Sequence, residues 1–257
     1  MKRRPIVGIN LKIYINTMDK ATGLAELVKE RFKDIRDADI FFIPSMGTIY
    51  PVSKALQGSN IIYGVQNIAS IENGAMTGEF SIESAVDLGC TMVEIGHAER
   101  KRIFKEDYSM INEKVKLTLN HDMIPLVCIG ESEPGDERAE ALKEQIVKIL
   151  SNIPHDQLFK VVLAYEPEWA IGKDKPAETS YVHESHRMIR EILSKAYGTE
   201  VKDAIRIIYG GSVKKENALD LAGHPDVDGL FIGRFGHDIN NFEEIVNLVR
   251  KAKEEIL

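Results

Sequence analysis

Side chains that could move a proton follow directly after short apolar runs of this sequence. Asn10 and Lys12 follow the first run, and His97 and Glu166 follow two later ones. Shifting a proton between the two carbons of an α-hydroxy carbonyl compound requires a base beside both carbons and donors directed at both oxygens. Glu166 can be that base, and the other three can supply the donors and the cation. This chemistry needs no metal, and no His, Cys and Asp cluster has metal-ligand spacing.

Glycine-containing turns could hold an anionic group of the substrate. Gly210-Gly211-Ser212 follows the seventh apolar run, Gly233 follows the eighth, and Gly172 lies after the sixth. Backbone N–H groups in such turns can converge on a phosphate, and helix N-termini add to this. One Gly-Gly-Ser is weak evidence, but turns of this kind after successive runs predict a phosphate site.

The elements that must position these groups alternate from end to end of the chain. Short β-branched runs that are apolar on both faces are typical of parallel strands buried on both sides. They are Ile6–Asn10, Ile40–Ile43, Ile61–Val65, Met92–Ile95, Ile124–Ile129, Val161–Tyr165, Ile205–Tyr209 and Gly229–Ile232. Helical periodicity is good over Lys20–Phe32, Asp107–Leu119, Glu137–Leu150, Glu178–Lys195 and Phe242–Glu254, and poor around 48–57 and 81–88.

Eight strands alternating with helices in 257 residues predict a closed (β/α)8 barrel in the α/β class. The alternative is an open doubly wound sheet, which usually has fewer strands. Nothing rich in Pro, Gly or Ser divides the chain, so a single domain over residues 1–257 is expected. In such barrels the catalytic groups lie at the C-terminal ends of the strands, and phosphate often binds after strands 7 and 8. Lys12, between Leu11 and Ile13, is expected to point into this mouth.

Composition limits the classes of partner and location. The formal charge is −7, and no stretch of Lys and Arg is dense enough for a nucleic-acid site. Cys90 and Cys128 both lie in apolar runs, so no disulfide framework is indicated. Pro5, Asn10 and Lys12 interrupt any apolar leader after the basic start, and no segment is long enough to span a membrane. A cytoplasmic protein without nucleic-acid or membrane partners is expected.

Three motifs in a fixed order resemble the triosephosphate isomerase family, and the resemblance covers nearly the whole chain. They are Gly-His-x-Glu-Arg at 96–100, Tyr-Glu-Pro-x-Trp-Ala-Ile-Gly at 165–172 and Tyr-Gly-Gly-Ser at 209–212, with further matches at 66–67, 74–79 and 128–131. The resemblance implies a TIM barrel that interconverts dihydroxyacetone phosphate and glyceraldehyde 3-phosphate through an enediolate. It implies no cofactor.

The resemblance also implies a role for each matching residue. Glu166 corresponds to the base and His97 to the electrophile, while Asn10 and Lys12 correspond to substrate contacts. Glu99 supports the site, although a structural partnership with Arg100 or Lys12 is an equal alternative. The phosphate-binding N–H groups correspond to those of Gly172, Ser212 and Gly233.

The chain departs from the family pattern in three places near the expected site. In the segment 170–177, which resembles the family's active-site lid, Lys173 and Asp174 replace a Thr and a Gly, and Pro176 stiffens the far hinge. Arg234 stands where the family has the second glycine of a phosphate turn, and its guanidinium could grip the phosphate or shift it. Leu11 replaces a usual Trp. A four-carbon ketose phosphate such as erythrulose phosphate is therefore the alternative substrate.

A long connection with little helical pattern, Asn67–Phe80, is of the kind that is usually functional or interfacial. The resemblance implies that it inserts into a second subunit of a homodimer, with Thr77 near the partner's site.

Some motifs allow other interpretations from the sequence alone. His183 and His186 lie three apart on an expected helix, where a solvated face is the alternative to a metal site. Asp226-x-Asp228 resembles the start of a calcium loop but leads straight into a strand. A non-catalytic phosphate-binding barrel is the rival of another class, and the presence of base, imidazole and ammonium argues against it.

Overall fold

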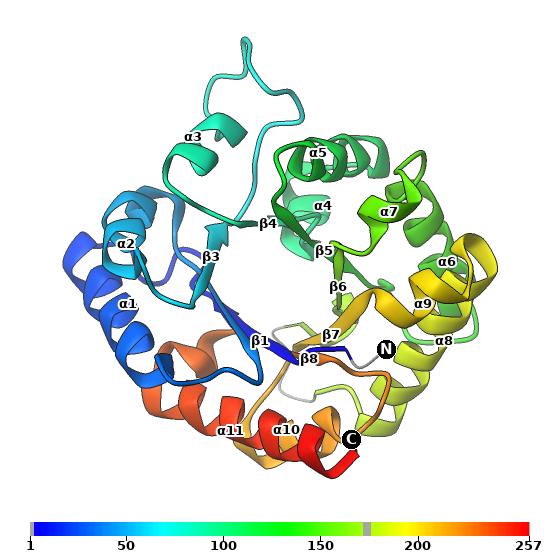
Figure 1. Cartoon of the computed structure of the whole chain (residues 1–257). Coiled ribbons are helices and arrows are strands. Elements are labelled where there is room, and N and C mark those ends of the chain that lie inside the picture. Colours follow the sequence, from blue (N-terminus) through cyan, green and yellow to red (C-terminus); the bar gives the residue numbers. More distant parts are fainter. Residues whose placement is uncertain (1–2, 172–175, 257) are drawn as a thin grey trace.

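The strands of the chain close into a parallel barrel. The computed structural model describes residues 3–171 and 176–256. Within them the strand order is β1 to β8 with β8 paired to β1, and the helices surround the strands in a ring (Figure 1). The strands are β1 Ile6–Asn10, β2 Asp39–Ile43, β3 Ile62–Val65, β4 Met92–Ile95, β5 Ile124–Ile129, β6 Val162–Tyr165, β7 Arg206–Gly211 and β8 Gly229–Ile232. The prediction of a closed (β/α)8 barrel is confirmed.

The helices follow the strands along the chain, with three short 3₁₀ segments between them in the described part. They are α1 Met18–Phe32, η1 Met46–Thr48, α2 Ile49–Leu56, α3 Ile82–Asp87, α4 Ala98–Phe104, α5 Tyr108–Asn120, α6 Arg138–Ile149, α7 His155–Leu158, η2 Glu168–Ala170, α8 Thr179–Tyr197, α9 Thr199–Ala204, α10 Lys215–Ala222, η3 Arg234–His237 and α11 Ile239–Ile256. Every long helix that periodicity predicted is present.

Both regions with a poor helical pattern nevertheless contain a helix. In α2 the buried side chains are Ile49, Val52, Ser53 and Leu56, a helical spacing that Pro51 in the first turn tolerates. In α3 the Ser81 side chain accepts a hydrogen bond from the Glu83 N–H at 3.1 Å, which caps a helix of only six residues. Such short helices are too brief to display a periodicity over several turns.

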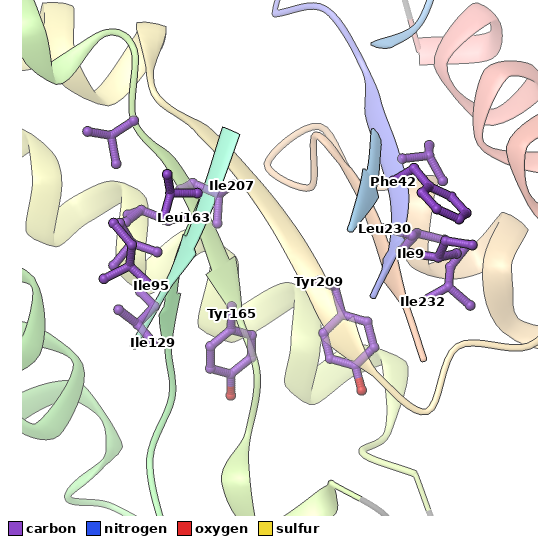
Figure 2. Close-up of a cluster of buried hydrophobic side chains, with 14 of the residues drawn as sticks. Ile9, Phe42, Ile95, Ile129, Leu163, Tyr165, Ile207, Tyr209, Leu230 and Ile232 are labelled. Atoms are coloured by element: carbon purple, nitrogen blue, oxygen red, sulfur yellow. The ribbon is translucent and has the colours of Figure 1, made fainter. Parts of the chain in front are cut away.

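Two apolar clusters confirm that the strands are buried on both faces. The larger lies between strands and helices, and Figure 2 shows part of it, including Ile9, Leu163 and Tyr209. The smaller consists of strand residues alone, among them Phe41 and Leu126, and therefore fills the barrel interior. Alternate residues of one strand serve the two clusters because successive side chains point to opposite faces. None of the described helices is long and apolar enough to cross a membrane.

Candidate active site

The end of β1 carries an amide and an ammonium group in a tightly bonded turn. Asn10 is 7% exposed, and its Oδ1 accepts hydrogen bonds from the Lys12 N–H at 2.7 Å and the Gln66 Nε2 at 2.9 Å. Lys12 has a φ of 47°, a left-handed conformation that costs energy for a residue with a Cβ. The two hydrogen bonds hold that turn, and the Lys12 side chain lines the cleft as predicted. Ile13, in contrast, is 77% exposed.

His97 stands at the N-terminus of α4, directly after β4. Its Nδ1 accepts a hydrogen bond from the Glu99 N–H at 3.1 Å. An imidazole nitrogen that accepts cannot carry a proton, so in the neutral ring the proton is on Nε2. That nitrogen lies 3.5 Å from Glu166 Oε2. The backbone therefore sets a tautomer that presents a donor to the cleft.

Glu166 follows β6 and reaches the cleft because its neighbours are glycines. Its N–H donates to the Ile129 carbonyl at 2.8 Å, and its side chain is 8% exposed. A Cβ on Gly210 would lie 2.5 Å from Glu166 Oε1, so only glycine leaves room for this carboxylate. Glu166 Oε2 has no hydrogen-bond partner among the described residues. A buried carboxylate with a free oxygen is suited to accept a proton.

Negative charges outnumber positive ones around the Lys12 ammonium. Its Nζ lies 2.6 Å from Glu99 Oε1. Burial lowers the pKa of Lys12, but the hydrogen bond to Glu99 and the charges of Glu99, Glu166 and Glu94 outweigh burial, and its pKa is raised. Burial raises the pKa of Glu99, and the bond and charge of Lys12 reverse this, so it is lowered. Of the two partners considered for Glu99, the structure shows Lys12, because Arg100 binds Glu106 at 2.5 Å instead.

The turns after β7 and β8 also line the cleft, between the end of β6 and the end of β1. The cleft has a volume of about 510 Å³, and its lining includes Ser212, Gly233 and Arg234. The Ser212 carbonyl accepts a hydrogen bond from the Asn217 Nδ2 at 3.0 Å, which fixes its turn against α10. Gly172, Lys173 and Asp174 lie outside the described residues. Their roles in phosphate binding and in a lid stay predictions.

Arg234 points along the cleft wall and rests on an aromatic ring. Its guanidinium carbon lies 5.5 Å from the Tyr14 ring centroid, within the range of a cation–π contact. The Tyr14 ring also lies 5.8 Å from that of His237, whose Nε2 is 3.0 Å from the Asn10 carbonyl oxygen. The side chain that replaces the family's glycine thus packs against the turn that bears Lys12.

Glu94, Tyr14 and Gln66 contact the predicted site residues, and none of the three was expected to have a role there. Glu94 Oε2 accepts a hydrogen bond from the Asn10 Nδ2 at 2.7 Å. A single acid in a strand that is otherwise apolar on both faces was a usable signal for Glu94. The match to the family pattern at 66–67 was a signal for Gln66, and no local pattern identifies Tyr14, because its contacts are made across the mouth.

The histidines of α8 do not form a solvated face. His186 is fully buried, with its ring 5.7 Å from that of Tyr165, so the expectation of a solvated face is wrong for this residue. Burial lowers the pKa of His186 to about 3. No group of His, Cys, Asp and Glu among residues 3–171 and 176–256 could hold a metal ion. Asp228 forms ion pairs with Arg3 and Arg190.

Comparisons with known proteins agree with this geometry. Residues 5–249 match the family described as triosephosphate isomerase. The chain is 47% identical over 254 residues to "Probable triosephosphate isomerase 2" of Listeria monocytogenes serotype 4b (strain F2365), which covers 98% of this chain and 99% of that protein. It is 46% identical over 254 residues, with the same coverage, to "Triosephosphate isomerase 2" of Listeria innocua serovar 6a.

A more distant relative is named triosephosphate isomerase, without the numeral 2 of the Listeria proteins. The chain is 37% identical over 247 residues to "Triosephosphate isomerase" of Carboxydothermus hydrogenoformans, covering 95% of this chain and 98% of that protein. These comparisons give no support to a four-carbon ketose phosphate as substrate. On the match over nearly its whole length, the chain belongs to the triosephosphate isomerase family.

Proposed function

We propose that the chain interconverts dihydroxyacetone phosphate and glyceraldehyde 3-phosphate in this cleft, with Glu166 as the base. As a family member it is an isomerase, an intramolecular oxidoreductase that acts on a small sugar phosphate. One observation carries the assignment of roles. Glu166 Oε2 and His97 Nε2 lie 3.5 Å apart in the same cleft as the Lys12 ammonium. The base Glu166 and the two donors His97 and Lys12 therefore line the same cleft.

In the proposed reaction, Glu166 takes a proton from one substrate carbon and returns it to the neighbouring carbon. The Nε2–H of His97 and the amide of Asn10 donate to the substrate oxygens, where negative charge develops in the enediolate. The Lys12 ammonium attracts the dianionic substrate and stabilises that charge. A glutamate base beside a neutral histidine is the known chemistry of this family, and the hydrogen bond to His97 Nδ1 supports it here.

For the phosphate, we infer that the N–H groups of Ser212 and Gly233 and the side chain of Arg234 form the binding site. All three residues line the cleft and follow β7 and β8, and β7 is the direct neighbour of β6, which ends before Glu166. Backbone donors suit a phosphate because they carry no competing charge, and a guanidinium adds a planar pair of donors.

The reaction can be tested by isomerising either triose phosphate in D₂O with the purified protein. A carboxylic acid formed at Glu166 exchanges its proton with solvent, so we expect deuterium on the carbon next to the new carbonyl group. Mass spectrometry and proton NMR of the product measure it. Product without deuterium would show that hydrogen moves directly between the carbons, and absence of any product would refute the proposed activity.

We also propose that the chain forms a homodimer. Figure 1 shows the connection between β3 and α3 standing out from the ring of helices. Its base is held firmly, because Asn67 Oδ1 accepts from Lys114 Nζ at 2.8 Å and Asn67 Nδ2 donates to Glu79 at 2.9 Å. Met76 and Ile71 on this loop are 37% and 42% exposed. A braced loop with exposed apolar side chains is typical of an interface.

The partner of this loop is expected to be a second copy of the chain. Near the mouth, Ile13 is 77% exposed, Tyr14 56% and Phe104 63%, which is apolar surface that a second copy could cover. Thr77 would then approach the partner's cleft. Light scattering at micromolar concentration should give twice the chain mass, and Met76→Glu should lower it. A fully active monomer would contradict the proposal. A cytoplasmic location remains an expectation from the sequence.

A further inference from the structure

Glu94 places a carboxyl group inside the barrel, beneath the cleft. It lies two residues after Met92 in β4, and Met92 belongs to the interior cluster, so both side chains point inward. Glu94 is 1% exposed. Acids are almost never buried this completely without a specific partner. The cluster around Met92 is apolar, so the partner must lie at the mouth.

The partner is the amide of Asn10. Glu94 Oε2 accepts from Asn10 Nδ2 at 2.7 Å, while Asn10 Oδ1 accepts from the Lys12 N–H at 2.7 Å. An amide has one donor end and one acceptor end, and Glu94 sets which end faces which neighbour. If the amide turned over, its NH₂ would face the Lys12 N–H, two donors without an acceptor. The turn that carries Lys12 with its φ of 47° would then lose the bond that holds it.

We propose that Glu94 is a positioning residue of the active site: it fixes the amide of Asn10 and, through that amide, the turn that holds Lys12 in the cleft. This proposal rests on the substrate-binding roles proposed for Asn10 and Lys12. Glu94 itself touches no reacting atom.

The surroundings of Glu94 favour an uncharged carboxylic acid. Lys12 faces it from the turn after β1, Glu99 from α4, Glu166 from the end of β6 and Cys128 from β5. Burial and then the charge of Glu166 raise the pKa of Glu94 well above its usual range. Glu94 Oε1 has no hydrogen-bond partner in the described part of the chain. Leaving such an oxygen buried costs less when the group is neutral.

The charge state has a consequence for substrate binding. An ionised Glu94 would add a negative charge beside Glu166 and Glu99, where a dianionic phosphate has to enter. We therefore expect affinity for the substrate to fall as pH rises through the raised pKa of Glu94. A glutamine at this position keeps an acceptor for Asn10 and cannot ionise.

The test compares Glu94→Gln, Glu94→Leu, Asn10→Ala and the double variant Glu94→Leu/Asn10→Ala. Met92→Leu is the matched control, because it changes the same inner face of β4 without touching Asn10. We expect Glu94→Leu to lower kcat/KM by about 10- to 100-fold, mainly through KM, since a small misplacement of a site residue can cost about 100-fold. Glu94→Gln should stay within about threefold of wild type at pH 7, as an amide oxygen also accepts.

Two further readouts separate positioning from a structural effect. The loss from Glu94→Leu should be much smaller in the Asn10→Ala background, and the alkaline fall of kcat/KM should be weaker in Glu94→Gln than in wild type. Calorimetry with inorganic phosphate should show weaker binding to Glu94→Leu even if the protein isomerises no triose phosphate, so the two proposals can fail separately. Wild-type kinetics and phosphate affinity in Glu94→Leu, or an equal loss in both backgrounds, would overturn the role of Glu94.

Discussion

The two ends of the barrel treat their ionisable side chains in opposite ways. At the mouth, the carboxyl groups of Glu94, Glu99 and Glu166 all act on the ammonium of Lys12. Glu94 Oε1 and Glu166 Oε2 have no hydrogen-bond partner among the residues described. At the opposite end, before β8, both oxygens of Asp228 are bonded, one to Arg3 at 2.6 Å and the other to Arg190 and to the Ile207 N–H.

The opposite end also supplies Arg190 with further partners, although its Nε has only an ion-pair contact, 3.8 Å from Asp226 Oδ1, and no hydrogen bond. Its Nη1 donates to the carbonyls of Lys202 at 2.7 Å and Ile205 at 2.5 Å. Charges that are paired and hydrogen-bonded hold strands and helices together, and they have little left to offer a ligand. A buried polar atom without a partner costs stability, and proteins keep such atoms where chemistry needs them. The mouth therefore keeps acidic groups free to act on a ligand, whereas the opposite end uses its charged groups to hold strands and helices together.

The largest expected effect is on turnover at the mouth. Glu166→Gln should lower kcat by about 10²- to 10⁴-fold, because it removes the general base. It should leave the thermal midpoint equal or higher, since a partly unpaired buried charge disappears. Steady-state kinetics and a thermal melt of one preparation measure both. An unchanged kcat would remove Glu166 from its proposed role.

At the opposite end, replacing an acid by its amide should lower stability and not turnover. Asp228→Asn removes the nearer of the two acids that pair with the buried Arg190 and should lower the free energy of unfolding by about 3–5 kcal/mol. Denaturant titration measures this, and kcat of the folded enzyme should stay close to wild type. If kcat fell while stability held, the two ends would not differ as described.

Lys12→Met tests the cation of the mouth. Losing a charged hydrogen-bond donor to the substrate should lower kcat/KM by about 10- to 150-fold, mainly through KM, which corresponds to about 1.5–3 kcal/mol. Glu99 then loses its partner, so stability should change little or fall slightly. If the variant had the kinetics of wild type, the Lys12 ammonium would face solvent and would not contact the substrate.

A smaller effect is expected from pH at the buried His186. Its pKa is about 3 in the folded chain, against an ordinary value of about 6.5. Below pH 6.5 the unfolded chain binds a proton that the folded chain does not, so stability is lost as pH falls from about 6.5 toward 3. The slope due to one such group is at most about 1.4 kcal/mol per pH unit. Denaturant titrations at pH 7 and pH 4.5 should show a smaller loss for His186→Gln than for wild type; equal losses would contradict it.

The smallest expected effect concerns Arg234, which is exposed at the cleft wall. Arg234→Ala should weaken inhibition by inorganic phosphate by about three- to tenfold, and Tyr14→Leu by about two- to fivefold through loss of the cation–π contact. Tyr50→Leu is the control, because Lys54 lies over that ring at 5.6 Å, outside the cleft. If Arg234→Ala binds phosphate as tightly as wild type does, the guanidinium of Arg234 does not contact the phosphate.

The order of elements and the location of the site followed from the sequence alone. Runs that are apolar on both faces identify parallel strands, and the closed barrel brings the residues after those strands to one mouth. Asn10, Lys12, His97 and Glu166 could therefore be named as neighbours without knowing a single contact. Short helices such as α3 escaped detection, because six residues cannot show a helical period.

What only the tertiary structure decided is how side chains distant in sequence pair with one another. Glu94 and Asn10 are 84 positions apart, and Lys12 and Glu99 are 87 apart. His186 looks solvated from its neighbours in the sequence, yet the Tyr165 ring and the strands beneath α8 bury it. Hydrophobic periodicity reports which face of an element is buried, an average over many residues. A hydrogen bond depends on the position of two atoms to within about half an ångström, and that is set by the packing of the whole barrel.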